Sequence, residues 1–316
     1  MRTLTNYAIA RFVSICGVLV FVRSLVFDRG ASFLVSFGVR PIQRNAACKL
    51  QFTKNRIGKR GKIIMKIADP ARCFIALDGD VSQSRQLIET YAPQGLGMKI
   101  GRKQIMSGHM HHLIQIVFEK GTGQNPIFID DKDFDIGMQV GGAVASVAAL
   151  FRGVTNPGYM TIANMGLSET LREAVNHKGC IKLLGVGVLT TQDKDELYET
   201  FVPNMLRQRT PRITSEIYLK YLVQKLAALS TKCGLDGIIC AGEHQQLLAN
   251  NPATTSLLRV VPGIRHEVKT DDQQRVTDAR KAFEDGAHGI IIGRELSQAK
   301  DPHRVIGDLL DYMNTD

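Results

Sequence analysis

The feature that most limits the fold is a regular alternation of short apolar runs with amphipathic segments. Eight such runs follow residue 64: CFIALD (73–78), GMKIG (97–101), PIFID (126–130), YMTIA (159–163), IKLLGVGVL (181–189), GIIC (237–240), LRVVP (258–262) and GIIIG (289–293). They are apolar throughout, as in parallel strands buried on both faces. Segments such as SETLREAV (168–175) separate them and have helical periodicity. Eight strands and intervening helices within residues 65–316 predict an α/β fold, the closed (β/α)8 TIM barrel.

A doubly wound open sheet is the alternative architecture for alternating strands and helices. Its dinucleotide-binding form has a glycine-rich loop directly after the first strand. The first strand is followed instead by ALDGDVSQS (76–84), and no phosphate-binding loop of the Walker A type occurs in the chain. The barrel is therefore the favoured fold.

The formal net charge of +10 has a local origin. Residues 1–64 contain twelve Lys or Arg and one acidic residue, Asp28, whereas the rest of the chain contains 28 basic and 29 acidic residues. The charge therefore does not indicate nucleic-acid binding by the folded domain. We expect residues 1–64 to be a basic extension outside the barrel, with Met65 as the working start. An organelle transit peptide is the alternative, because such peptides are rich in Arg and poor in acids.

Neither a membrane span nor a secreted protein is expected. The apolar stretch FVSICGVLVFVRSLVF (12–27) is short for a span and is interrupted by Arg23. Six cysteines are scattered without any CxxC pair, which gives no indication of a zinc ribbon or a redox motif. Reduced thiols in the cytoplasm are the simplest interpretation, with an organelle as the alternative if residues 1–64 are a transit peptide.

Charged residues stand at the ends of several predicted strands, where a barrel places its chemistry. They are Asp78, Lys99, Asp130 with Lys132 and Asp135 just beyond it, Arg265, and Arg294 after Gly293. Side chains two positions apart in a strand point the same way, so Asp130 and Lys132 are expected to face the barrel mouth together. Carboxylates around a buried lysine keep it cationic. Taken singly, Asp135 is explained as a helix N-cap and Lys99 as a surface lysine.

The cluster GHMHH (108–112) raises the question of a metal site. His109, His111 and His112 have no nearby carboxylate and lack the i, i+4 pairing of a helical site. The cluster also lies away from the predicted strand ends. We interpret it as a solvated helix face and predict no metal ligands.

Seven motifs across residues 73–300 resemble the orotidine 5'-phosphate decarboxylase family. They are ALD (76–78), KIG (99–101), FIDDKDFDI (128–136), LTT (189–191), PGIR (262–265), DDQQRV (271–276) and GRELSQAKDP (293–302). The resemblance implies conversion of orotidine 5'-monophosphate to UMP and CO2 in pyrimidine biosynthesis. It also implies a homodimer with shared active sites and no metal or organic cofactor. The local origin of the charge and the short apolar stretch described above are the reasons for expecting no nucleic-acid and no membrane partner.

The same resemblance implies a role for each matching residue. Lys132 corresponds to the proton donor, Asp130 lies beside the departing carboxylate, Lys99 completes the charge array, and Asp135 reaches into the partner's site. The residues implied in substrate binding are Asp78 and Lys99 at the ribose hydroxyls, Thr190 at the pyrimidine, and Arg265, Gln273, Gly293 and Arg294 at the phosphate.

Three positions depart from the family pattern. Gln139 replaces a Thr that touches the neighbouring subunit's ligand, Ala163 replaces a His, and one residue is missing between Arg265 and Gln273. These changes bear on affinity and rate more than on reaction type. Two alternatives follow. One is a Mg2+-dependent sugar-phosphate relative, in which D-x-K-x-x-D is often followed by Gly, as by Gly137 here. The other is a non-catalytic nucleotide-binding relative.

Overall fold

A computed structural model describes residues 9–15, 18–24, 38–40, 69–264, 277–297, 299 and 301–314. The chain divides into two compact units, Met1–Ile64 and Met65–Asp316. In the first unit, β1 (Ile9–Ile15), β2 (Val18–Ser24) and β3 (Gly38–Arg40) form an antiparallel sheet in the order β1-β2-β3.

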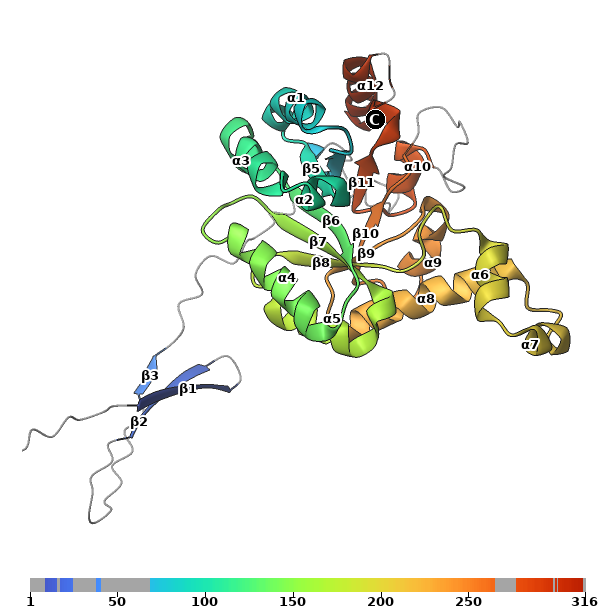
Figure 1. Ribbon diagram of the computed structural model, residues 1–316, viewed down its shortest axis with the longest axis horizontal. Helices are drawn as coiled ribbons and strands as arrows, with labels where there is room; N and C mark the ends of the chain where they lie inside the picture. The colour runs from blue at the N-terminus through green and yellow to red at the C-terminus, as the bar shows by residue number, and fades with distance from the viewer. Residues whose placement is uncertain are drawn as a thin grey trace, which may run out of the picture. The chain divides into compact units, whose positions relative to one another are not determined.

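The second unit contains a closed barrel of parallel strands (Figure 1). Its strands are β4 (Cys73–Ala76), β5 (Gly97–Gly101), β6 (Ile127–Asp133), β7 (Gly158–Ala163), β8 (Lys182–Val186), β9 (Gly237–Ile239), β10 (Leu258–Val261) and β11 (Gly289–Ile292). Neighbours follow chain order, and pairing of β11 with β4 closes the ring. Each strand overlaps one of the eight apolar runs, so the predicted (β/α)8 architecture is confirmed.

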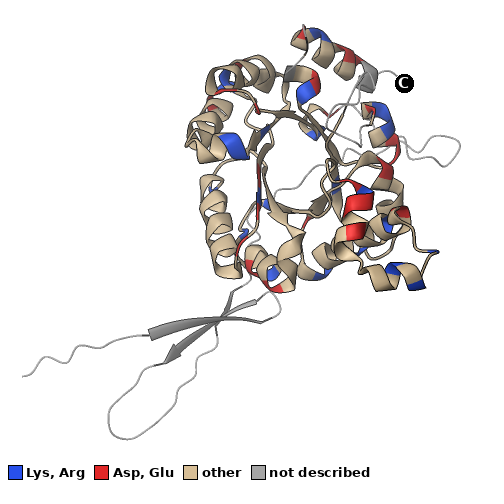
Figure 2. Ribbon diagram, turned by 45° about the vertical axis from the view of Figure 1, so that its right-hand side comes forward, with Lys and Arg blue, Asp and Glu red and all other residues tan. Residues whose placement is uncertain are grey.

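Helices surround the barrel on its outside (Figure 2). They are α1 (Val81–Tyr91), α2 (Arg102–Met106), α3 (Met110–Lys120), α4 (Gly137–Leu150), α5 (Leu167–His177), α6 (Lys194–Phe201), α7 (Asn204–Arg209), α8 (Ser215–Cys233), α9 (Gln245–Ala249), α10 (Ala279–Glu284), α11 (Arg294–Ser297) and α12 (Pro302–Asn314). Short 3-10 turns lie at Pro70–Arg72, Ala92–Gln94, Asn164–Gly166 and Gly242–His244. Among the described residues, no helix has both the length and the apolar character needed to cross a membrane.

Local capping explains where α1 begins and where α8 begins and ends. At α1, the Asp80 carboxylate accepts from the Gln83 backbone N–H and the Gln83 side chain accepts from the Asp80 N–H, which forms a capping box. The Thr214 hydroxyl accepts a hydrogen bond at the start of α8. The same helix ends at Cys233, and the following Gly234 has a φ of +86°, which suits the left-handed cap.

The barrel interior is filled at one end and open at the other. Phe74 and Phe128 meet edge to face with 5.5 Å between ring centroids, and they pack in a cluster that includes Leu184 and Ile291. Strand side chains alternate, so the residues two positions further on also point inward but lie nearer the C-terminal end. Those residues include the small Ala76 and the charged Asp130, and both line a cavity there.

Candidate active site

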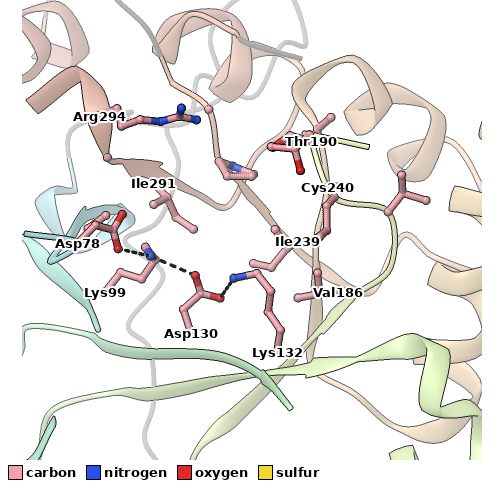
Figure 3. A pocket seen from close by; sticks show the side chains of 18 residues that line it. Asp78, Lys99, Asp130, Lys132, Val186, Thr190, Ile239, Cys240, Ile291 and Arg294 are labelled. Carbon is pink, nitrogen blue, oxygen red and sulfur yellow. Dashed lines mark hydrogen bonds and ion pairs between the residues drawn. The ribbon is translucent and has the colours of Figure 1, made fainter. Parts of the chain in front are cut away.

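A cavity of about 280 Å3 lies at the C-terminal end of the barrel (Figure 3). Its charged and polar lining includes Asp78, Lys99, Asp130, Lys132, Thr190 and Arg294. Val186, Ile239 and Ile291 line it with apolar groups. In Figure 3, Arg294 and Thr190 stand across the drawn space from Asp130 and Lys132. The cavity therefore combines a charged end, an apolar wall and a second polar end.

Four charged side chains form a continuous array along one side of this cavity (Figure 3). The Lys99 ammonium donates to Asp78 Oδ1 at 3.2 Å and to Asp130 Oδ2 at 3.1 Å. The Lys132 ammonium donates to Asp130 Oδ1 at 2.8 Å. Asp130 thus binds one lysine with each carboxylate oxygen. Three strands or strand ends supply these residues, so the barrel itself fixes the array.

Burial and pairing oppose each other in this array, and pairing prevails. Burial disfavours the charged form of Lys99, but the carboxylates of Asp130 and Asp78 outweigh it and raise the pKa of Lys99. Burial likewise acts to raise the pKa of Asp130, but Lys99 and Lys132 hold that pKa below its ordinary value. Lys99 and Asp130 are therefore both ionised at neutral pH although both are buried.

Lys132 reaches the cavity by a different route from the one predicted. Ile129 pairs with Met160 and Asp133 pairs with Ile162, so β6 advances four residues where β7 advances two. Lys132 lies in this irregular stretch with a φ of +55°, in the left-handed region. The prediction that Asp130 and Lys132 come together through regular strand alternation is therefore wrong in its mechanism, although both side chains do line the cavity.

The acidic neighbours of Lys132 lie outside the array. Arg102 Nη1 lies 3.4 Å from Asp131 Oδ1 and donates to the Asp131 carbonyl at 3.2 Å. Asp133 is half-buried, and burial together with the charges of Asp131 and Asp135 raises its pKa. These contacts suit a structural role for both residues.

Asp135 and Gln139 do not line the cavity of their own chain. Both are exposed, and Asp135 Oδ1 accepts from the Ile136 backbone N–H at 2.7 Å. Asp135 is not the N-cap of α4, because that position belongs to Ile136. Apolar side chains surround this segment on the surface: Phe134 is 65% exposed, Ile136 63% and Met138 71%.

The residues expected at the phosphate are placed in part. Gly293 and Arg294 line the cavity at the end of β11 and the start of α11. Pro262 and Gly263, at the end of β10, line it as well. Arg265 and Gln273 fall outside the described residues. Thr190, expected at the pyrimidine, lines the cavity after β8.

Sequence reasoning missed several residues of the site. Four of them line the cavity: Val186, Ile239, Cys240 and Ile291. Val186 could have been found, because it lies two residues beyond the core residue Leu184 on the same strand and therefore points inward as well. Thr161 was also missed, although it and Tyr159 are the two residues with a hydroxyl group in the run YMTIA. Its hydroxyl donates to Asp130 Oδ1 at 3.2 Å. Ala163, where the family has His, is half-buried at the end of β7.

The histidine cluster lies apart from the cavity. His111 and His112 are exposed on α3, and His109 directly precedes that helix. In the stretches of chain that the structure describes, no group of three His, Cys, Asp or Glu side chains is arranged to hold a metal ion.

Comparison with known proteins assigns this barrel to a group of relatives. A family model described as "Orotidine 5'-phosphate decarboxylase / HUMPS family" matches residues 72–308. The orotidine 5'-phosphate decarboxylase of Aquifex aeolicus is 34% identical over 248 residues, which cover 77% of this chain and 98% of the relative. That of Nitrosospira multiformis is 31% identical over 236 residues, covering 74% of this chain and 90% of the relative.

Solved structures agree on the fold. The crystal structure of orotidine 5'-phosphate decarboxylase from Lactobacillus acidophilus matches with a TM-score of 0.59 at 22% identity, covering 77% of this chain and 99% of that one. The enzyme of the same name from Pyrococcus horikoshii OT3 matches with a TM-score of 0.52 at 16% identity, covering 77% and 100%. These two likenesses bear on the architecture alone.

Proposed function

The chain belongs to the orotidine 5'-phosphate decarboxylase / HUMPS family, and from that premise we propose that it is an orotidine 5'-phosphate decarboxylase. As a carboxy-lyase of pyrimidine biosynthesis, it converts orotidine 5'-monophosphate to UMP and CO2. The observation that most supports this function is the ion-paired Lys99–Asp130–Lys132 array, buried at one end and open to the cavity at the other.

The chemical difficulty is the electron pair left on the ring when CO2 departs. The bond between the ring carbon and the carboxylate breaks, and its electrons remain on that carbon. The Lys132 side chain is 40% exposed and lines the cavity, so its ammonium is available to stabilise the developing negative charge. Lys132 then gives a proton to the ring carbon, forming the C–H bond of UMP, and is reprotonated from water.

Asp130 and Lys99 hold this proton donor in place. The Asp130 carboxylate fixes the Lys132 ammonium through a 2.8 Å contact, and Lys99 neutralises the other carboxylate oxygen. Because Asp130 lies beside the departing substrate carboxylate, loss of neutral CO2 shifts the negative charge from that carboxylate to the ring carbon, where the Lys132 ammonium is proposed to act. Fixed charges of this kind need no rearrangement during the reaction, which is the basis of electrostatic preorganisation.

Groups away from the reacting carbon bind the rest of the nucleotide. Asp78 and Lys99 bind the ribose hydroxyls, and Thr190 contacts the pyrimidine. Gly293 and Arg294 bind the phosphate together with Arg265 and Gln273. Phosphate binding energy from this distant end is available to lower the barrier at the ring, because it orients the substrate against Lys132.

We also propose that the active form is a homodimer, with Asp135 and Gln139 completing the partner's site. The support is the position of these residues: both are exposed, outside their own cavity, in a segment with three exposed apolar side chains, Phe134, Ile136 and Met138. Apolar groups gathered on a surface are typical of interfaces. The residues proposed for the reaction are lysines and carboxylates of the protein, and no metal or organic cofactor is proposed.

Three measurements separate this function from its two alternatives. The full chain is incubated with orotidine 5'-monophosphate in EDTA, and UMP and CO2 are measured. Production of both without added metal supports the decarboxylase. Activity that appears only on sugar phosphates with Mg2+ identifies the sugar-phosphate alternative, which was suggested by Gly137 after the D-x-K-x-x-D motif. Tight UMP binding without turnover identifies a non-catalytic relative.

A further inference from the structure

Thr161 joins the two residues at the centre of the array, although it does not line the cavity. Thr161 lies in β7 and is fully buried, with 0% of its surface exposed. Its Oγ1 accepts a hydrogen bond from the Lys132 backbone N–H at 2.9 Å. The same hydroxyl donates to Asp130 Oδ1 at 3.2 Å. One hydroxyl therefore uses both its donor and an acceptor site on the charged array.

The Lys132 N–H needs such a partner because the sheet is irregular there. Between the Ile129–Met160 and Asp133–Ile162 pairs, β6 has two more residues than β7. The extra residues leave the ordinary ladder, as in a β-bulge. Thr161 lies on β7 within this interval, and its side chain takes the place of a backbone acceptor for Lys132.

The backbone of Lys132 is also in a conformation that requires support. Its φ of +55° lies in the left-handed region, which is unfavourable for residues other than glycine. Conformations of this kind persist when surrounding contacts hold them, and they gather at functional sites. In Lys132 the contact at the strained backbone is the Thr161 hydroxyl.

These contacts close a ring through a single carboxylate oxygen. The Lys132 backbone reaches Asp130 Oδ1 through the Thr161 hydroxyl, and the Lys132 ammonium reaches the same Oδ1 directly at 2.8 Å. Both ends of the lysine are thereby tied to one atom.

We propose that Thr161 is a positioning residue that aims the Lys132 ammonium at the reacting carbon by fixing the Lys132 backbone and the Asp130 carboxylate together. The inference rests on the proposed decarboxylation. A purely structural threonine would support only folding, so its loss would lower stability and leave the rate per folded enzyme unchanged. A positioning residue would lower kcat and leave substrate binding nearly intact.

Three substitutions in the full chain test this role. Thr161→Val keeps the shape and removes the hydroxyl, whereas Thr161→Ser keeps the hydroxyl. Thr254→Val is the matched control, because Thr254 is equally buried and its hydroxyl donates to the Leu248 carbonyl at 2.7 Å, outside the cavity. We expect Thr161→Val to lower kcat for orotidine 5'-monophosphate by about 10- to 100-fold, as small misplacements of catalytic groups do, with KM changed by less than about threefold.

Thr161→Ser should restore kcat to within about fivefold of wild type, and Thr254→Val should leave it unchanged even if its unfolding midpoint falls. Wild-type kcat in Thr161→Val, or equal loss in the Val and Ser variants, would overturn the inference. If Thr161→Val does not fold, Thr161→Ala is judged by the same criteria. If the wild-type chain produces no UMP, the proposed function is overturned and the inference falls with it. That result differs from a failure of the inference alone, in which the wild-type chain is active and the Thr161 variants do not behave as expected.

Discussion

Lys132 Nζ lies 2.8 Å from Asp130 Oδ1, and the two side chains differ in their access to solvent: that of Lys132 is 40% exposed and that of Asp130 is 12% exposed. The carboxylate is thus held in the protein while the ammonium remains available to the cavity. Lys99 is buried on the other side of Asp130 and balances its charge. The arrangement holds the ammonium of Lys132, the proposed proton donor, beside the cavity through its ion pair with Asp130.

The buried ion pair of Asp130 and Lys99 makes the free energy of unfolding depend on pH in a defined direction. The pKa of Asp130 is lowered in the folded protein, by Lys99 and Lys132 against the effect of burial, so its contribution is present above the ordinary carboxyl pKa of 3.8 and is lost as pH falls below it. The pKa of Lys99 is raised, so its contribution is present below 10.5 and is lost as pH rises above that value.

Asp130→Asn should therefore lower the free energy of unfolding by roughly 3 kcal/mol at neutral pH, because among the described residues it leaves buried Lys99 with Asp78 as its one remaining counter-ion. The difference from wild type should shrink as pH falls below 3.8. Urea unfolding between pH 3 and pH 9 measures it. Asp308→Asn, at an exposed pair with Arg304, is the control and should change little. A difference in unfolding free energy that does not change with pH would contradict the lowered pKa of Asp130.

The eight strands and the positions of Asp78, Lys99 and Asp130 were predictable because buried parallel strands are uniformly apolar and charges at their ends stand out. The left-handed conformation of Lys132 was not, since no glycine marks it. Thr161 was missed because its contact with Asp130 joins two residues 31 positions apart on separate strands. Such contacts depend on how β6 and β7 align in the sheet, and a local sequence pattern does not specify that alignment.

A shared active site predicts that two inactive variants restore each other. Lys132→Ala and Asp135→Ala chains should each be nearly inactive as homodimers. A mixed dimer has one site with both defects and one site with intact Lys132 and the partner's intact Asp135. Unfolding and refolding the two together should recover about a quarter of wild-type activity, the statistical share for symmetric dimers. No recovery from a mixture shown to contain mixed dimers would place Asp135 outside the partner's site.

Arg294 should act on binding more than on chemistry, because it stands across the cavity from the array. A charge-assisted hydrogen bond is worth about 1.5–3 kcal/mol, so Arg294→Ala should raise KM for orotidine 5'-monophosphate by roughly 10- to 150-fold. Steady-state kinetics measure this change. Arg85→Ala, at an exposed pair with Glu89, is the matched control and should match wild type. An unchanged KM in Arg294→Ala would remove Arg294 from phosphate binding.

A chain that begins at Met65 should retain full activity. The family model matches residues 72–308, and the match to the Aquifex aeolicus relative covers 98% of that protein. We therefore expect kcat and KM within about twofold of the full chain, because the described cavity residues all belong to the unit Met65–Asp316. Parallel assays of the two purified proteins measure it. A large loss of kcat with an unchanged unfolding midpoint would show that residues 1–64 contribute to the reaction.

The turnover number of Lys132→Ala, measured with saturating orotidine 5'-monophosphate in EDTA, tests the account most directly. The variant should fold with a circular dichroism spectrum like that of wild type and lose roughly 1,000-fold or more in kcat, since both charge stabilisation and proton delivery depend on this ammonium. Lys103→Ala, at an exposed lysine of α2, should keep normal turnover. A folded Lys132→Ala variant with near-normal kcat would contradict the assignment of Lys132 as the proton donor.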